Sequence, residues 1–276
     1  MGDMQGRSQG HSQGRSQGLV VRDLEKHFGG VQAVCGVDFS VQPGECVALI
    51  GPNGAGKSTT FACIAGQHAP SSGQVLWQGE TLNALQPAQR LQRGIARTFQ
   101  VAQIFEALTV LQNVQLLLPA TPVMSPLQVL DKQEPSAALA LLARVGLQTQ
   151  AGQAARQLSY GAKKRLELAM ALAGLRAGPG LLLLDEPAAG LAPSERAELM
   201  QLVRSLAHDA VAHARLAVLY TEHNMDAVFG IADRVLVLME GRLVASGTAE
   251  EVASNTVVLT HYLGRSFGKK GAVGHA

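Results

Sequence analysis

Short apolar runs alternate with helical patterns along the middle and the end of this chain. Four runs are five or six residues long, which is typical of strands buried on both faces: residues 46–50, 181–185, 215–220 and 234–239. Helical patterns follow three of them, at residues 57–66, 193–208 and 223–231. The second of these helices places Leu199, Val203 and Leu206 on one face. Because parallel strands need a crossover, which is usually a helix, this alternation predicts an α/β fold with a mainly parallel sheet.

Three other regions depart from this alternation. Residues 19–28 and 33–42 alternate between apolar and polar positions without helices, which predicts an antiparallel β flank. Residues 104–172 carry mostly helical patterns, so we expect a helical subdomain inserted into the sheet. Near the end, residues 240–242 predict a hairpin turn, and residues 248–251 predict a capping box that opens a last helix.

The two termini lack the patterning that a packed segment needs. Residues 1–18 repeat the sequence GRSQG and hold no apolar residue after Met4, and residues 266–276 are rich in glycine. Such segments cannot offset the conformational entropy lost on ordering. We therefore expect one folded domain over residues 19–265, between a disordered N-terminal tail and a flexible C-terminal tail.

The composition is that of a globular chain with few charges. Charged residues make up 16% of the 276 residues and hydrophobic residues 47%, and 23 Lys and Arg against 21 Asp and Glu give a net charge of +2. These values exclude a disordered chain and argue against electrostatic binding of nucleic acid. Cys35, Cys46 and Cys63 are too few to hold a disulfide scaffold together, and we interpret them as reduced thiols of a cytosolic protein.

The longest uncharged run, residues 107–130, is long enough to cross a bilayer. It contains four amide side chains and three prolines, however, so no part of it is continuously apolar over the length of a span. The N-terminus also lacks the apolar core of a secretory signal. We predict no transmembrane helix.

The segment from Gly51 to Thr59 carries the first chemical motif. It fits the pattern G-x-x-x-x-G-K-[ST] between a predicted strand and a predicted helix, which is the context that a phosphate-binding loop needs. Glycines let backbone N–H groups curl around a phosphate, and the helix N-terminus adds its positive dipole end. Lys57 supplies a point charge for the β- and γ-phosphates, and Ser58 a hydroxyl ligand for Mg²⁺. The predicted binding residues are Gly51, Pro52, Asn53, Gly54, Ala55, Gly56, Lys57, Ser58 and Thr59.

Asp185 and Glu186 end the buried run at 181–185. At the carboxyl edge of the sheet, beside a phosphate loop, Asp185 is expected to hold Mg²⁺, directly or through water, and Glu186 to polarise the attacking water. Without that loop, two adjacent acids at a strand end are also compatible with a solvated turn.

The remaining candidates are weaker on their own. Ser159, within the segment LSYGA, fits the N-cap of a helix that runs to about Ala173. Taken alone, this segment is better explained as an ordinary capped helix. His223 follows an apolar strand, Gln100 follows the segment IARTF, and Phe28 is a single aromatic. Taken alone, these three would be a structural histidine, a surface glutamine and a core side chain.

Together, these motifs closely resemble the nucleotide-binding subunits of ABC transporters, over about residues 19–264. The resemblance implies the ABC ATPase fold, a P-loop NTPase core that binds ATP and Mg²⁺. It implies that Phe28 stacks on adenine and that Gln100 approaches Mg²⁺ and senses the membrane partner. Glu186 would be the catalytic acid, and His223 the switch histidine at the γ-phosphate.

Ser159 and Gly161 resemble the signature residues of the family, which reach ATP held by the opposite subunit. This implies a second ATPase subunit, identical or paralogous, and an opening and closing of the pair with each hydrolysis. Two departures stand out: LSYGA replaces the usual LSGGQ, and Ala192 and Pro193 stand in a loop that usually carries an aspartate. Neither removes a phosphate ligand or the base, so we still expect hydrolysis.

Several segments resemble importers of branched-chain amino acids and their relatives for urea, short amides and aromatic acids: residues 28–34, 94–100, 108–114, 158–172, 185–193 and 222–229. The resemblance implies a peripheral ATPase at the cytoplasmic face of a bacterial inner membrane. Its partners would be membrane-spanning permease subunits and, indirectly, a solute-binding protein. The permease subunits would dock through the groove between the α/β core and the helical insert, near Gln100 to Glu106.

Two other functions remain open at this point. A soluble ABC ATPase would act in repair, translation or cofactor assembly. ATPases of repair and translation usually carry coiled coils or paired cassettes, and this sequence shows a single cassette. Among the soluble functions, the sequence therefore fits cofactor assembly best. A P-loop GTPase switch would need the guanine-reading N-K-x-D, which does not occur here, and would not explain LSYGA.

Overall fold

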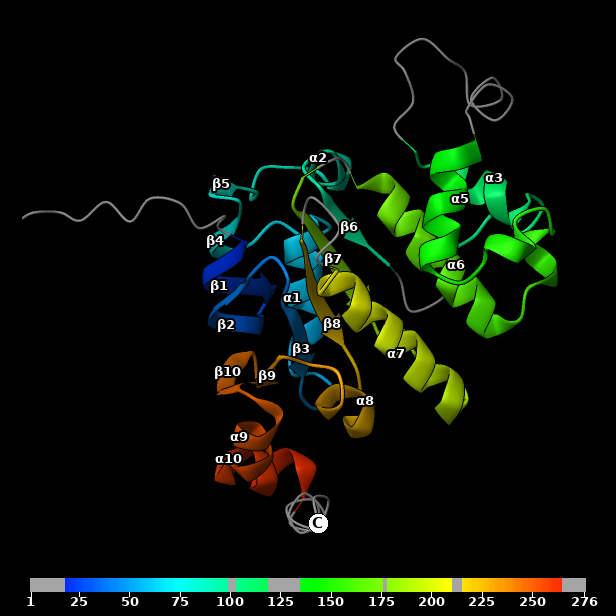
Figure 1. Cartoon of the computed structure of the whole chain (residues 1–276). Helices are drawn as coiled ribbons and strands as arrows, with labels where there is room; N and C mark the ends of the chain where they lie inside the picture. The colour runs from blue at the N-terminus through cyan, green and yellow to red at the C-terminus, as the bar shows by residue number, and fades with distance from the viewer. Residues whose placement is uncertain (1–17, 99–102, 119–134, 176–177, 210–214, 265–276) are drawn as a thin grey trace, which may run out of the picture.

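The computed structural model of the chain describes residues 18–98, 103–118, 135–175, 178–209 and 215–264. It contains two β-sheets with helices packed around them (Figure 1). In the view of Figure 1, the antiparallel sheet lies on one side of the central sheet, and the helices α3, α5 and α6 lie on the other.

The central sheet has six strands in the order β10-β9-β3-β8-β7-β6. They are β3 (Cys46–Ile50), β6 (Ile95–Arg97), β7 (Gly180–Asp185), β8 (Leu216–Thr221), β9 (Arg234–Met239) and β10 (Arg242–Gly247). All neighbours from β9 to β6 are parallel, whereas β10 pairs with β9 in an antiparallel hairpin. The four apolar runs therefore form parallel strands as predicted, and the hairpin turn at 240–242 is confirmed.

The helices follow the strands or form the insert. Those on the central sheet are α1 (Lys57–Ala65), α7 (Pro193–Ala207), α8 (Met225–Phe229) and α9 (Ala249–Ser254). The insert contains α3 (Val110–Gln115), α5 (Pro135–Arg144), α6 (Tyr160–Gly174) and the turns η1 (Gln148–Gln150) and η2 (Ala155–Gln157). The remaining elements are α2 (Pro87–Gln92), α10 (Thr256–Val258) and the π-helical turn η3 (Leu259–Leu263). The described part of residues 104–172 is thus helical, as predicted, and the capping box of Thr248 and Glu251 opens α9.

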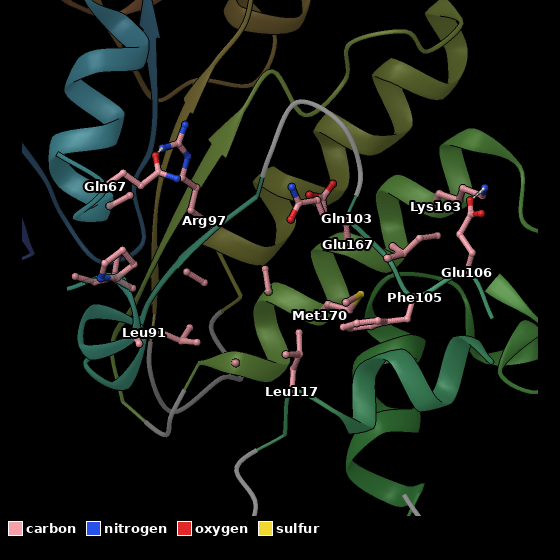
Figure 2. Close-up of a pocket in the computed structure, with 18 of the residues that line it drawn as sticks. Gln67, Leu91, Arg97, Gln103, Phe105, Glu106, Leu117, Lys163, Glu167 and Met170 are labelled. Atoms are coloured by element: carbon pink, nitrogen blue, oxygen red, sulfur yellow. Dashed lines mark hydrogen bonds and ion pairs between the residues drawn. The ribbon is translucent and has the colours of Figure 1, made fainter. Parts of the chain in front are cut away.

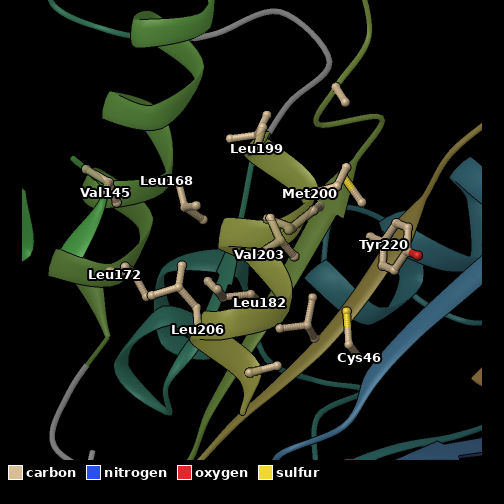
Figure 3. Close-up of a cluster of buried hydrophobic side chains, with 14 of the residues drawn as sticks. Cys46, Val145, Leu168, Leu172, Leu182, Leu199, Met200, Val203, Leu206 and Tyr220 are labelled. Atoms are coloured by element: carbon tan, nitrogen blue, oxygen red, sulfur yellow. The ribbon is translucent and has the colours of Figure 1, made fainter. Parts of the chain in front are cut away.

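Alternate residues of the central strands enter two hydrophobic clusters, one on each face. Leu181 and Leu183 share a cluster with Phe61 of α1, whereas Leu182 shares the other with Val203 of α7. Figure 3 shows α7 placing its apolar side chains between those of the strands and those of α6. Burial on both faces explains why these strands are continuously apolar in the sequence.

The antiparallel flank has four strands in the order β2-β1-β4-β5. They are β1 (Leu19–Phe28), β2 (Val31–Val41), β4 (Ser72–Trp77) and β5 (Glu80–Thr81). The first two form the predicted pair. β4, β5 and the three-residue β6 had no counterpart in the sequence analysis. β4 and β6 pair with strands that are distant in sequence, as Trp77 pairs with Leu19, and β5 has only two residues.

The other sequence predictions are tested in part. The three cysteines are free, as expected, and all three are buried. Burial raises the pKa of the Cys46 thiol to about 12. Over the described residues, the structure contains no helix with the length and apolar character of a membrane span. Residues 119–130 of the uncharged run lie outside the described residues, as do 1–17 and 265–276, so the predictions for both tails and the exact domain boundaries stay predictions.

Candidate functional site

Three strands of the central sheet end at one edge, and each leads into a predicted motif. β3 leads into the loop that begins at Gly51, β7 ends in Asp185, and β8 ends two residues before His223. In the parallel register, Leu49 and Asp185 both lie opposite Thr221. Ligands of open parallel sheets bind at this edge. The fold thus brings the phosphate loop together with motifs that follow it by more than a hundred residues in sequence.

Glycines shape the loop that follows β3. Gly51 has a φ of 149° and Gly56 a φ of 99°, both in the left-handed region. A Cβ on Gly51 would collide with the carbonyl oxygen of Leu238, and one on Gly56 would collide with that of Ala33. Gly56 is also the N-cap of α1 and supplies no side-chain hydrogen bond to it. The first amides of this helix are therefore available to an anion.

The Lys57 side chain is buried and folds back over the loop. Its Nζ donates to the carbonyl oxygens of Gly51 at 2.7 Å and Pro52 at 3.0 Å. Burial lowers the pKa of Lys57, and the negative charges of Glu186 and Asp185 oppose this shift. The ammonium group therefore interacts electrostatically with both carboxylates.

Thr221 holds the two acids in place. Its Oγ1 donates to Oδ1 of Asp185 at 2.9 Å and accepts from the Glu186 N–H at 3.1 Å. On the other side, Nη2 of Arg97 lies 2.8 Å from Oδ2 of Asp185. Glu186 has a φ of 47°, and its bonds to Thr221 stabilise this left-handed conformation. Sequence analysis missed Thr221 and Arg97, because strand register decides their positions.

His223 and Glu186 form a hydrogen-bonded pair. The Nε2 atom of His223 lies 2.6 Å from Oε1 of Glu186. The His223 side chain is 46% exposed and that of Glu186 is 21% exposed, so both can meet a ligand at the edge. The structure thus brings together the predicted base and the predicted switch histidine.

A further acid, Glu222, lies buried beneath this pair. It accepts from the N–H of Ala188 at 3.0 Å and from the N–H of His223 at 3.3 Å. Burial and the neighbouring charge of Glu186 raise the pKa of Glu222, and the two N–H donors lower it. Sequence analysis gave this residue no role. Its place between an apolar strand and His223 was the available signal.

The predicted signature segment lies at the start of α6. Oγ of Ser159 accepts from the N–H of Ala162 at 3.3 Å, which confirms the predicted N-cap. A Cβ on Gly190 would lie 3.2 Å from the Tyr160 ring, so this segment packs near the loop that follows the two acids. Among the described residues, no hydrogen bond or ion pair joins Ser159 or Gly161 to residues 51–59. A role at the nucleotide of another subunit stays a prediction.

Phe28 lies at the end of β1 and is 44% exposed. Its ring centroid lies 5.2 Å from that of His68 in an edge-to-face arrangement, and Nζ of Lys26 lies 4.9 Å from it. An exposed ring of this kind can stack on a base. Gln100 lies outside the described residues, and its predicted role stays untested.

The donor set at the edge suits magnesium. Among the described residues, no group of three or more His, Cys, Asp or Glu side chains could hold a metal ion. Ser58, which is exposed at the start of α1, and Asp185 offer two hard oxygens. Mg²⁺ keeps several waters and is usually held by one or two protein oxygens together with substrate phosphates. These residues therefore fit Mg²⁺ bound together with a nucleotide.

A groove of about 900 Å³ lies between the central sheet and the helical insert (Figure 2). Its core side includes Ala65, Gln67, Pro87, Ala88, Leu91, Ile95, Ala96 and Arg97. Its insert side includes Gln103, Ile104, Phe105, Glu106, Leu117, Tyr160, Lys163, Glu167, Met170, Ala171 and Gly174. The Phe105 side chain is 52% exposed, and Nζ of Lys163 lies 2.7 Å from Oε1 of Glu106.

The strand order and the phosphate loop at the carboxyl edge of β3 define a P-loop ATPase with a helical insert. Residues 34–189 match the family described as ABC transporter, and this match covers more than half of the chain. The chain therefore belongs to the ABC transporter family and is an ATPase coupled to transport, as the sequence analysis expected. This membership does not fit the alternative of a GTPase switch.

Two curated relatives match over nearly their whole length. The chain is 37% identical over 262 residues to the high-affinity branched-chain amino acid transport ATP-binding protein LivG of Escherichia coli K12, covering 90% of this chain and 98% of LivG. It is 32% identical over 249 residues to the lipopolysaccharide export system ATP-binding protein LptB of Haemophilus influenzae, covering 90% of this chain and 98% of LptB. The resemblance to the branched-chain amino acid group is confirmed.

The fold prediction is confirmed by solved structures. The ADP conformation of MJ1267, an ATP-binding cassette of an ABC transporter, is similar with a TM-score of 0.76 and 30% identity, covering 90% of this chain and 99% of that one. Nucleotide binding is thus a property of this family.

Proposed function

We propose that this chain powers the import of small polar solutes, with branched-chain amino acids as the first candidate and urea or related short amides and acids as the next. The observation that carries this proposal is the 37% identity to LivG over 98% of that relative. The identity to the lipopolysaccharide export ATPase is lower, at 32%. We further propose that the chain lies at the cytoplasmic face of the membrane.

The loop at 51–59 binds the phosphates of ATP through its amides and through Lys57. Nζ of Lys57 donates to two loop carbonyls here, which leaves the third N–H of its ammonium group for a phosphate oxygen. Ser58 and Asp185 hold Mg²⁺, which neutralises charge on the phosphates when bound. Phe28 stacks on the adenine, and Gln100 approaches the metal.

Glu186 accepts the proton of the attacking water. His223 holds one oxygen of this carboxylate at 2.6 Å, which fixes its direction. We assign the contact with the γ-phosphate to the same imidazole, which is 46% exposed at this edge. Thr221 sets the backbone of Glu186, so the base is positioned before substrate arrives.

Two subunits complete each site. Ser159, Gly161 and the N-terminus of α6 from the opposite subunit cover the γ-phosphate, add hydrogen-bond donors and exclude water. The second subunit is identical or paralogous. Closure on ATP and opening after hydrolysis drive the permease subunits, one of which docks in the groove beside Phe105.

Uptake by the assembled transporter tests this proposal. The chain is co-expressed with a candidate permease pair and solute-binding protein, purified in detergent and placed in proteoliposomes. We expect ATP-dependent uptake of labelled leucine, with labelled urea as the second substrate. Glu186→Gln should keep ATP binding and lower turnover by about 10²–10⁴, the scale of a lost general base. Glu198→Gln, an exposed acid paired with Arg165, is the matched control.

The turnover of Glu186→Gln and the proteins that co-purify with the chain test separate parts of this proposal. Near-normal turnover in Glu186→Gln would show that Glu186 is not the base. Co-purification only with soluble proteins would favour a soluble ABC ATPase, for example one that acts in cofactor assembly.

A further inference from the structure

Arg97 lies between the groove and the predicted magnesium acid. It is the last residue of β6, and in the parallel pairing it lies opposite Leu183, two residues before Asp185. Its Nη2 lies 2.8 Å from Oδ2 of Asp185, and the two side chains are only 13% and 17% exposed. Limited exposure to solvent reduces the screening of this pair.

The same guanidinium reaches the groove. Arg97 lines the cavity, and its Nη1 bonds the Oε1 of Gln67, a second lining residue just after α1. Figure 2 shows both side chains together at the core side of the groove, with Phe105 on the insert side. A segment that fills the groove would meet Arg97 and Gln67 at once.

Arg97 also contacts the helix that carries the phosphate loop. Its Cζ lies 6.0 Å from the ring centroid of Phe61, a buried residue of α1. Lys57 and Ser58 open this helix. One side chain thus touches the docking groove, the acid at the end of β7 and the helix that begins at the nucleotide site.

We propose that Arg97 is a positioning residue that links occupation of the groove to magnesium binding at Asp185. This inference rests on the proposed function, in which a permease segment fills the groove. In the isolated subunit, the guanidinium holds Oδ2 of Asp185 and its positive charge weakens the binding of Mg²⁺. A segment that presents a carboxylate or carbonyl oxygen to Arg97 and Gln67 draws the guanidinium away and so strengthens Mg²⁺ binding.

Magnesium titration of the isolated full-length subunit tests whether Arg97 weakens Mg²⁺ binding. The Mg²⁺ concentration for half-maximal binding of ADP is measured by calorimetry for the wild type, Arg97→Met and Arg97→Lys. Arg97→Met should lower it by about three- to tenfold because a positive charge leaves the metal site. Arg97→Lys keeps the charge and should stay within about twofold. Arg93→Met is the matched control, since Arg93 forms an exposed pair with Glu80 away from the groove.

The assembled transporter tests whether occupation of the groove strengthens Mg²⁺ binding through Arg97. The ratio of ATPase rates with and without permease is measured at limiting and at saturating Mg²⁺. In the wild type, we expect stimulation to be larger at limiting Mg²⁺, and in Arg97→Met this difference should disappear. Arg97→Gln replaces Arg97→Met if the latter does not fold, as judged by its thermal midpoint.

Each outcome is decisive. An unchanged magnesium requirement in both charge-removing variants overturns the proposal, and so does a changed requirement with unaltered stimulation at limiting Mg²⁺. If the wild type is not stimulated by permease at all, docking in the groove fails as a function. The titration of the isolated subunit still tests the effect of Arg97 on the metal site in that case.

Discussion

At the scale of single residues, the site combines strain with dense hydrogen bonding. Glu186 adopts a φ of 47°, a conformation that non-glycine residues rarely take, and Thr221 holds it with its side chain and its backbone. Glu222 ties the neighbouring loop to the same strand end through the N–H of Ala188. The backbone of the base is therefore held by Thr221 and its neighbour Glu222, which are not among the predicted catalytic residues.

Glu222 makes a pH-dependent contribution to stability. Its pKa is raised above 4.5 by burial first, so the folded state holds its proton more tightly than the unfolded state does. Its contribution is fully present below pH 4.5 and is lost as pH rises through the raised pKa. The wild type should therefore lose free energy of unfolding relative to Glu222→Gln over this window, as measured by urea denaturation at successive pH values. A constant difference between the two proteins would contradict this.

At the scale of elements, two helices with similar N-caps, α6 and α9, are predicted to differ in function. Ser159 caps α6 and is exposed, whereas Thr248 caps α9 far from the motifs in sequence. Both oxygens accept from a backbone N–H of the first turn, at 3.3 Å and 3.2 Å. Only the first cap is predicted to meet a nucleotide.

The two caps offer a matched comparison. Ser159→Ala and Thr248→Ala should each cost about 1 kcal/mol of stability, the usual value for a lost N-cap. Only Ser159→Ala should also reduce ATP turnover, by about tenfold or more, with nucleotide binding by the isolated subunit retained. Thermal unfolding and steady-state ATPase assays measure both effects. Equal turnover in the two variants would show that Ser159 acts as a cap alone.

The elements also show how far sequence patterns reach. The five residues of β3 are fully buried, so their apolar run was a strong signal. β6 has only three residues, and its position at the sheet edge depends on pairing with Leu181 to Leu183. No periodicity exists in so short a segment, which is why Arg97 at its end was not foreseen.

At the scale of the whole molecule, the few charges of the chain have two explanations. The central strands β3, β7 and β8 are buried along their length and carry no charged residue in their interiors. The groove between core and insert exposes apolar side chains such as Phe105 and Leu117. Exposed apolar surface inside a groove is typical of a binding site.

Charge introduced into the groove should block docking. Phe105→Asp is expected to reduce co-purification with permease subunits by about tenfold or more, because a carboxylate must be desolvated in an apolar contact. Val257→Asp is the matched control, since Val257 is 48% exposed on α10 outside the groove. Retained thermal midpoints show that both variants fold. Equal recovery of permease with both variants would place the docking surface elsewhere.

The sequence by itself determined the phosphate loop, the two acids, the four buried strand segments and the capped helices, because each depends on neighbours along the chain. Only the tertiary structure decided that Thr221 and Arg97 hold Asp185, that Glu222 supports His223, and which side chains line the groove between core and insert. These contacts depend on parallel register and on crossover packing. A register is set by the combined burial of many side chains, and no local pattern encodes it.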